Sequence, residues 1–353
     1  MKKKPWLINP AYDLFSFFSF FWTVPFLYLL QANLSPIQLG RLMPLLIFAN
    51  RLHLCVPIVF SLFLMREASE LERRRFVTHS TAIAVLVPLA VWASFSMSAI
   101  LIYMLPTLVA GWATWHFYLQ DRGVLSLYRS RQPNITRTQV NLDRAACLIF
   151  SLLNPIQYWF RTGYRFQAFN GQLDFSWADR ILPWPDVRWA GAAFFLFYLV
   201  MQLRNRALLT PRSLYVAALF GQFLCMSNLQ FLPPFFEYLI RVVNHNITEL
   251  SLQFQMWKNQ QSFVPISKSR WAVAGAAMAI SVGLLMLIAF RFPFIYPIEN
   301  GFFDIRYFIS FPNAWVISGL VSVFIVLNLL HFLSGHYAYN FTNPHVRKLL
   351  KFP

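Results

Sequence analysis

The chain has 353 residues, of which 58% are hydrophobic and only 12% charged, yet its formal net charge is +17. Soluble domains carry about 25% charged residues, so this composition leaves too little polar surface for a water-facing domain and excludes intrinsic disorder. The three cysteines, Cys55, Cys147 and Cys225, show no CxxC spacing and are predicted to be small core residues. The composition therefore predicts an integral membrane protein.

Apolar segments long enough to cross a bilayer recur along the chain. Crossing about 30 Å of hydrocarbon takes about 20 mostly apolar residues. The stretch 81–120 fits two crossings that divide near residues 94–98, and Pro233–Pro234 separates two others because proline cannot continue a helix. We predict an all-α, polytopic integral membrane helical bundle, one domain over residues 1–353, with about ten transmembrane helices. They lie at 13–30, 43–65, 81–120 (two), 145–160, 189–203, 214–232, 236–257, 271–290 and 314–334.

The basic residues lie in short segments between these predicted helices. Short cytoplasmic loops carry an excess of Lys and Arg, so their placement indicates orientation. If the chain crosses ten times, the basic segments all fall on one side: 2–4, 66–75, 122–144, 204–212, 258–270 and 347–351. We therefore predict a multi-pass protein of the bacterial inner membrane with both termini in the cytoplasm and its basic loops near anionic lipid headgroups. Nucleic acid is not an expected partner, because the basic residues form no single stripe interleaved with exposed aromatics.

Four predicted helices contain a histidine within or near the membrane core. These are His53, His116, His245 and His331, and His336 follows about one turn after the last of them. A polar side chain in hydrocarbon is costly unless it has a partner, so each histidine needs a structural or functional reason. A single intramembrane histidine is often a hydrogen-bond partner between helices, and that interpretation stays open for His53, His116 and His331.

The predicted helix at 236–257 carries a stripe of ionisable residues. Glu237, Arg241, His245 and Glu249 recur at intervals of four and therefore share one helix face. Such a face must point into the bundle or into a wet cavity rather than toward lipid. We expect Glu237 to pair with Arg241 toward the outer leaflet, and His245 and Glu249 to lie in the inner half of the bundle.

Imidazole and carboxylate groups on facing helices predict a metal centre that holds iron, manganese or zinc. The candidate ligands are His53, His116, His245, Glu249 and His331. Glu249, Gln120 and His336 are the candidate catalytic or supporting groups, and Gln120 lies one turn after His116. The predicted substrate is a lipid or another lipophilic, membrane-soluble small molecule, and the predicted reaction is oxidative.

Other functions remain open at this level. A transporter or lipid flippase would use Glu237, Arg241, His245 and Glu249 as its polar pathway, with kinked helices at Pro233–Pro234. Haem bound through two mid-span histidines and a purely structural role are further alternatives. Common motifs of hydrolases, zinc proteases, nucleotide-binding proteins and histidine-rich membrane desaturases are absent, and the oligomeric state is open.

Two segments resemble a family of uncharacterised bacterial polytopic membrane proteins. The first is a WHxxxQxxG pattern that begins at Trp115 and continues through Tyr128 and Asp143 to Pro155. The second runs from His331 through Pro344 to Arg347. In that family an Asp stands four residues after the histidine of the last helix, whereas this chain has Gly335, with His336 beside it. The layout of one histidine per helix is also similar to Brp/Blh-type membrane carotene dioxygenases, which implies iron bound through such residues.

Overall fold

A computed structural model describes most of the chain, and its residues form two compact units. Unit 1 comprises Met1–Leu39, Thr114–Tyr164 and Phe175–Glu249, and unit 2 comprises Gly40–Ala113, Arg165–Asp174 and Leu250–Pro353. The described residues are 5–35, 38, 52–61, 65, 68–97, 99–133, 135–153, 166–168, 171–173, 187–205, 207, 209–226, 234–261, 272, 275–276, 278–283, 314–338 and 343–350. The units alternate along the chain, so they are not two sequential domains, and the single-domain expectation stays a prediction.

Helices dominate the described residues, in agreement with the predicted all-α class. They are α1 (Pro10–Ser16), α2 (Phe20–Asn33), α4 (Glu70–Met97), α5 (Ala99–Arg131), α6 (Arg137–Cys147), η1 (Leu148–Leu153, a π-helical turn), α9 (Val187–Arg204), α10 (Pro211–Met226), α11 (Pro234–Gln261), α14 (Ala314–Ala338) and α15 (Pro344–Leu349). One short antiparallel hairpin is the exception. It pairs β1 (Phe166–Ala168) with β2 (Gly171–Leu173), and Phe166 lies opposite Leu173.

The helix boundaries follow local sequence signals. Asn9 caps α1 by accepting a hydrogen bond from the Tyr12 amide at 2.9 Å, and Pro10 occupies the first turn, where its missing N–H costs nothing. Thr136 and Gln139 form a capping box at the start of α6. Pro234 begins α11, at the division predicted from the proline pair.

The predicted long stretch 81–120 does consist of two helices, because α4 ends at Met97 and α5 begins at Ala99. Both helices extend well beyond the apolar segments, α4 backwards to Glu70 and α5 forwards to Arg131. Basic segments expected in loops are therefore partly helical. Most of the predicted crossings at 43–65 and 271–290 lie outside the described residues.

In unit 1, α10 packs against α2, α6 and α9. Two glycines permit close approach: an added Cβ would meet the Phe223 ring at 2.3 Å at Gly191 and the Phe20 ring at 2.2 Å at Gly221. Phe150 packs against Phe223 with 5.3 Å between ring centroids. Small residues thus allow these helices to pack on aromatic rings, as is common between transmembrane helices.

A buried ion pair links α6 to α10 within unit 1. Arg212 donates through Nη1 to Asp143 Oδ1 at 3.0 Å and through Nε to Gln132 Oε1 at 2.8 Å, and Tyr198 donates to the same Asp143 oxygen at 3.3 Å. Burial raises the pKa of the Asp143 carboxyl above its ordinary value, and the charge and hydrogen bond of Arg212 oppose that change. The second carboxylate oxygen lies 3.9 Å from Arg129 Nη1.

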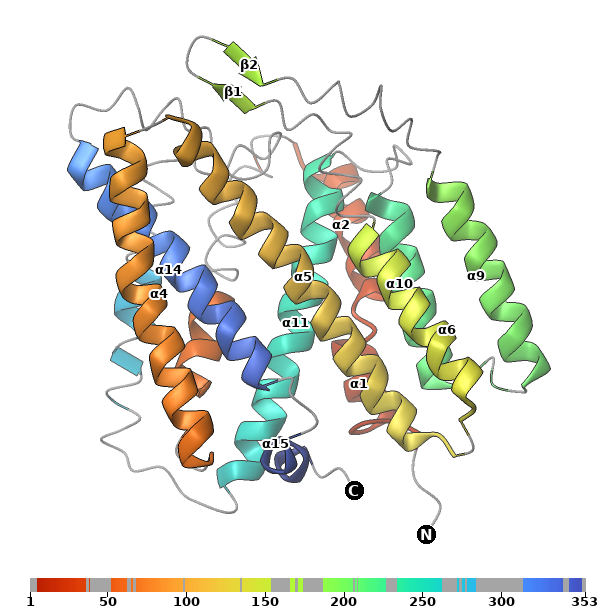
Figure 1. Cartoon of the computed structure of the whole chain (residues 1–353). Coiled ribbons are helices and arrows are strands. Elements are labelled where there is room, and N and C mark those ends of the chain that lie inside the picture. Colours follow the sequence, from red (N-terminus) through yellow and green to blue (C-terminus); the bar gives the residue numbers. More distant parts are fainter. Residues whose placement is uncertain are drawn as a thin grey trace. The chain divides into compact units, whose positions relative to one another are not determined.

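In unit 2, α4 and α14 run side by side (Figure 1). The rings of Phe76 and Tyr337 meet edge to face at 5.3 Å, and Asn343 donates to Glu72 Oε1 at 2.7 Å. Near the C-terminus, Asn259 of α11 donates to the Leu349 carbonyl of α15 at 2.5 Å. The contact of Phe76 with Tyr337 anchors α14, which carries one of the candidate ligands.

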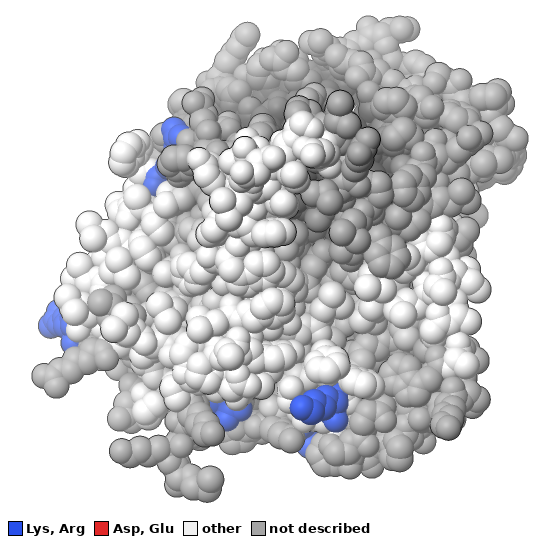
Figure 2. All heavy atoms as spheres, turned by 180° about the vertical axis from the view of Figure 1, so that it is seen from behind, with Lys and Arg blue, Asp and Glu red and all other residues white. Residues whose placement is uncertain are grey.

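Several helices expose large apolar side chains. On α4 they include Val85, Leu86, Leu89 and Trp92, and α9 exposes a similar row. On the face seen in Figure 2, the described Lys and Arg atoms form small separate groups with a broad uncharged area between them. The residues hidden inside, by contrast, include many polar and charged ones.

Among the described residues, one helix is long and apolar enough to cross a membrane, the Glu70–Ala93 part of α4. The pair α1 and α2, bent by 50° at the break between them, passes the same criterion when taken as one span. Core helices of soluble proteins can pass it too, but only 11% of the apolar window of α4 is buried. The prediction of about ten transmembrane helices is not confirmed by these residues and stays a prediction.

Candidate metal centre

The centre of the candidate site in unit 1 is the carboxylate of Glu249. Glu249 and His245 lie one turn apart on α11, so both side chains project from the same face. Glu249 is completely buried and His245 nearly so. The His245 Nε2 atom lies 3.3 Å from Glu249 Oε2. Their helical spacing therefore brings an imidazole nitrogen and a carboxylate oxygen together, as the sequence predicted.

A second imidazole approaches the same carboxylate oxygen from α5. His116 Nε2 lies 3.7 Å from Glu249 Oε2, and the His116 and His245 ring centroids are 5.0 Å apart. His116 is only 4% exposed, although its neighbour Trp115 is half exposed. The helical period thus points His116 inward toward α11. Three of the predicted ligands therefore meet within unit 1.

Polar contacts hold α5 and α11 together around this group. Gln120 donates through Nε2 to the His245 carbonyl at 3.1 Å. Arg241 donates to Asp121 at 2.6 Å. The predicted pairing of Arg241 with Glu237 involves a side chain outside the described residues. Gln120 therefore supports the backbone beneath His245, and Arg241 belongs to a buried ion pair.

Unit 2 contains a separate pair of neighbouring histidines. His53 lies in the helical stretch 52–61 and His331 on α14, and both are almost completely buried. Their rings meet edge to face with 4.5 Å between centroids and an angle of 68° between planes. Two buried imidazoles at this distance can present nitrogen atoms to one ion.

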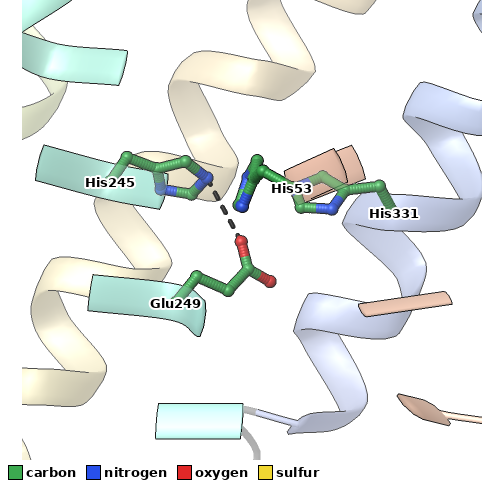
Figure 3. A group of neighbouring side chains, drawn as sticks. All are labelled: His53, His245, Glu249 and His331. Carbon is green, nitrogen blue, oxygen red and sulfur yellow. Dashed lines mark ion pairs between the residues drawn. The ribbon is translucent and has the colours of Figure 1, made fainter. Parts of the chain in front are cut away.

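Four side chains have the composition of a metal site. His53, His245, Glu249 and His331 each offer one ligand atom, and these atoms lie within 4.8 Å of one another (Figure 3). All four are buried, and Figure 3 shows the three imidazoles and the carboxylate grouped together. This group could hold a metal ion.

The distances and donor types fit an ion. Two ligand atoms that each lie about 2.1 Å from one metal are about 3.0 Å apart at right angles and about 4.2 Å apart on opposite sides. The 3.3 Å between His245 and Glu249 falls within that range, as does the 3.7 Å between His116 and Glu249. Three imidazoles with one carboxylate suit iron, zinc or manganese.

One predicted residue, His336, lies outside the group of four, and one residue that was not predicted, Asp121, is buried beside the candidate ligands. His336 is exposed at the end of α14, lies outside the group of four and stacks edge to face on Tyr337. Asp121, which pairs with Arg241, is a buried residue that the sequence did not predict for the site. The signal was present: Asp121 follows the His116–Gln120 turn directly, but the predicted helix ended at residue 120.

Comparison with known proteins does not assign the chain to a family. No protein-family model, no curated protein and no solved structure matches it.

Proposed function

We propose that the chain is a multi-pass membrane protein with a metal-dependent, oxidative enzyme activity on a lipid or another lipophilic substrate. The observation that carries this proposal is the group of four buried ligand atoms from three imidazoles and one carboxylate. Glu249 provides the negative charge, and its Oε2 atom lies within 4 Å of nitrogen atoms of both His245 and His116. A bound cation would offset the cost of burying that carboxylate.

The distribution of polar and apolar side chains supports a lipid environment. Ionisable groups such as Asp121, Arg241 and Glu249 are buried, whereas Leu86, Leu89 and Trp92 of α4 are 45–61% exposed. In water this arrangement would leave large apolar surfaces exposed, and such surfaces normally mark a membrane or a partner. A site enclosed in such a protein is reached most easily by a substrate that dissolves in the bilayer.

The ligand set supports redox chemistry at a non-haem centre. Imidazole and carboxylate ligands that leave coordination positions open are typical of iron sites that activate oxygen, and this is the chemistry that bound iron would supply. The chain would contribute the ligands, the exclusion of water by buried apolar neighbours, and the support of the His245 backbone by Gln120. Manganese would fit the same proposal, whereas zinc would not support oxidation.

Metal analysis of the purified full-length protein tests the proposal. We expect about one iron or manganese ion per chain in detergent micelles after dialysis against metal-free buffer. The variants His245→Ala and Glu249→Gln should each lose the ion, because each removes a ligand from a site that needs all of its donors. The variant His53→Ala tests whether the histidines of unit 2 are ligands as well.

His336→Ala and His79→Ala are the matched controls, because both histidines are exposed and lie outside the group of four. They should keep the ion. Wild-type protein that remains free of metal after reconstitution with iron, manganese or zinc would contradict the metal centre. Stoichiometric zinc alone, bound in preference to iron and manganese, would contradict the oxidative reaction while leaving the centre itself intact.

A single optical spectrum tests the haem alternative, because haem ligated by two histidines absorbs strongly near 400 nm. A polar pathway is less well supported, since Arg241 is engaged with Asp121 and Gln222 inside unit 1. Proteoliposome flux driven by a pH gradient would favour a transporter over the proposed enzyme.

A further inference from the structure

A second buried network lies beside the candidate ligands in unit 1. The Arg241 guanidinium donates through Nη2 to Asp121 Oδ2 at 2.6 Å and through Nη1 to Gln222 Oε1 at 2.8 Å. Tyr215 donates to the other Asp121 oxygen at 2.9 Å. Arg241 and Asp121 are both less than 10% exposed. The network therefore holds the Arg241 guanidinium through the hydrogen bonds that it donates to Asp121 of α5 and Gln222 of α10.

Phe117 connects this network to the candidate ligand His245. The Arg241 guanidinium carbon lies 5.2 Å from the centroid of the Phe117 ring, within the range of a cation–π contact. The same ring meets the His245 imidazole with 4.4 Å between centroids and an angle of 62°. Arg241 and His245 are one turn apart on α11, so Phe117 contacts two successive residues of the ionisable stripe.

The contacts between α5 and α11 follow one another along both helices. Asp121 faces Arg241, Phe117 and Gln120 contact His245, and His116 faces Glu249. Of these contacts, Phe117 packs on the His245 ring and Gln120 binds the His245 carbonyl. The ion pair keeps Arg241 over Phe117, and Phe117 in turn limits rotation of the His245 ring. Burying an ion pair costs desolvation free energy, and a role in positioning His245 would explain why the Asp121–Arg241 pair is present.

We infer that Asp121, Arg241 and Phe117 are positioning residues that hold the His245 imidazole in the orientation required for metal binding. None of them is a ligand in this assignment. The inference rests on the proposed metal centre and deepens it. Groups that orient a ligand typically change metal affinity 10- to 100-fold when they are replaced, because the ligand must be reordered each time the ion binds.

Cobalt(II) titration of the full-length protein in detergent tests the inference. Co²⁺ is the probe because its visible absorption reports coordination geometry as well as occupancy. We expect Asp121→Asn and Phe117→Leu each to weaken Co²⁺ binding about 10- to 100-fold, measured by competition with a chelator. Both should also change the visible spectrum of the bound ion, which a loss of general stability would not do.

Asp143→Asn is the matched control. This variant disrupts the buried pair of Asp143 and Arg212, which lies in the same unit and includes none of the candidate ligands. This control should keep the wild-type affinity within about twofold and the wild-type spectrum. Phe117→Leu removes no charge, so it keeps the test informative if Asp121→Asn does not fold.

Three outcomes would overturn the inference. The first is wild-type affinity and spectrum in both Phe117→Leu and any folded Asp121→Asn protein. The second is an equal loss in Asp143→Asn, because the effect would then reflect stability alone. The third is wild-type protein that binds no Co²⁺, which would contradict the proposed metal centre itself and is therefore distinguishable from the first two.

Discussion

Glu249 is the residue whose environment most needs an explanation. Its carboxylate is completely buried, and nitrogen atoms of His245 and His116 lie 3.3 and 3.7 Å from the same oxygen. A protonated histidine or a bound cation would compensate the negative charge. These two explanations assign different roles to His116. If a metal is held by the other four candidate ligands, His116 is a supporting neighbour. If a protonated histidine balances the charge, His116 is one of the two side chains that could carry the proton.

His116→Gln distinguishes these explanations at the residue scale. We expect this variant to retain the metal at saturation while its affinity falls about 10- to 100-fold, as for a group just outside the ligand set. Chelator competition against the wild type provides the measurement, with His245→Ala as the reference for complete loss. Undiminished affinity in His116→Gln would show that His116 does not support the centre.

The candidate ligands could be proposed from residue type and helical spacing alone. Histidine and glutamate are expensive in apolar helices, so their presence in such sequence is informative without a structure. The spacing of His245 and Glu249 also predicts a shared face. The sequence could not reveal the partner of Arg241, because Asp121 lies on another helix 120 residues away. It also could not show that His336 is exposed at the helix end.

At the scale of elements, the helices of unit 1 approach one another through glycine. Gly191 of α9 faces the Phe223 ring of α10, and Gly221 of α10 faces the Phe20 ring of α2. A methyl group at either position would lie less than 2.5 Å from an aromatic carbon, well inside van der Waals contact. Phe223 is completely buried and Phe20 partly so, and a ring in a packed interface has few alternative rotamers, so the ring or the helix must shift to admit a methyl group.

We expect Gly191→Ala and Gly221→Ala each to destabilise the protein by about 1–3 kcal/mol through overpacking, even though alanine favours helix more than glycine does. Gly319→Ala on α14 is the matched control, because no atom lies within 4 Å of an added Cβ there. The control should be neutral or up to about 1 kcal/mol more stable. Denaturant unfolding in detergent measures all three variants, and equal stability of Gly221→Ala and Gly319→Ala would contradict the close packing.

Helix positions were easier to predict than helix lengths. The division between α4 and α5 was predicted because the apolar stretch is too long for one crossing, and the start of α11 because proline cannot continue a helix. The ends of α4 and α5 were predicted too short, because hydropathy stops where charged residues begin. Backbone hydrogen bonding does not stop there, and Arg74 even pairs with Glu70 one turn away at 2.9 Å.

At the scale of the whole molecule, four acidic side chains are buried among the described residues but only two basic ones, Arg212 and Arg241. Asp13, Asp121, Asp143 and Glu249 are buried, whereas the described basic residues on the face in Figure 2 form small surface groups. The net charge of +17 is the excess of 30 Lys and Arg over 13 Asp and Glu, and we predict that most of the basic residues lie in short loops between apolar helices. Short loops of this kind remain preferentially in the cytoplasm, which connects composition to orientation.

This connection predicts the side on which each terminus lies. An even number of crossings places both termini on the same side, and the basic loops place that side in the cytoplasm. A green fluorescent protein fused after Pro353 should therefore fluoresce in a bacterial host. Alkaline phosphatase fused at the same position should be inactive, because it requires the oxidising periplasm. The same phosphatase inserted in the predicted outer loop at 161–186 should be active.

The phosphatase insertion in that loop is also the control for expression. It carries the same reporter as the C-terminal fusion, so its activity shows that the fused protein is made and inserted. Active phosphatase at the C-terminus would mean an odd number of crossings or an inverted orientation. Neutralising the basic residues at 204–212 separates those two cases. An orientation determined by loop charge should become mixed in that variant, whereas an odd number of helices would leave the two ends on opposite sides in every molecule.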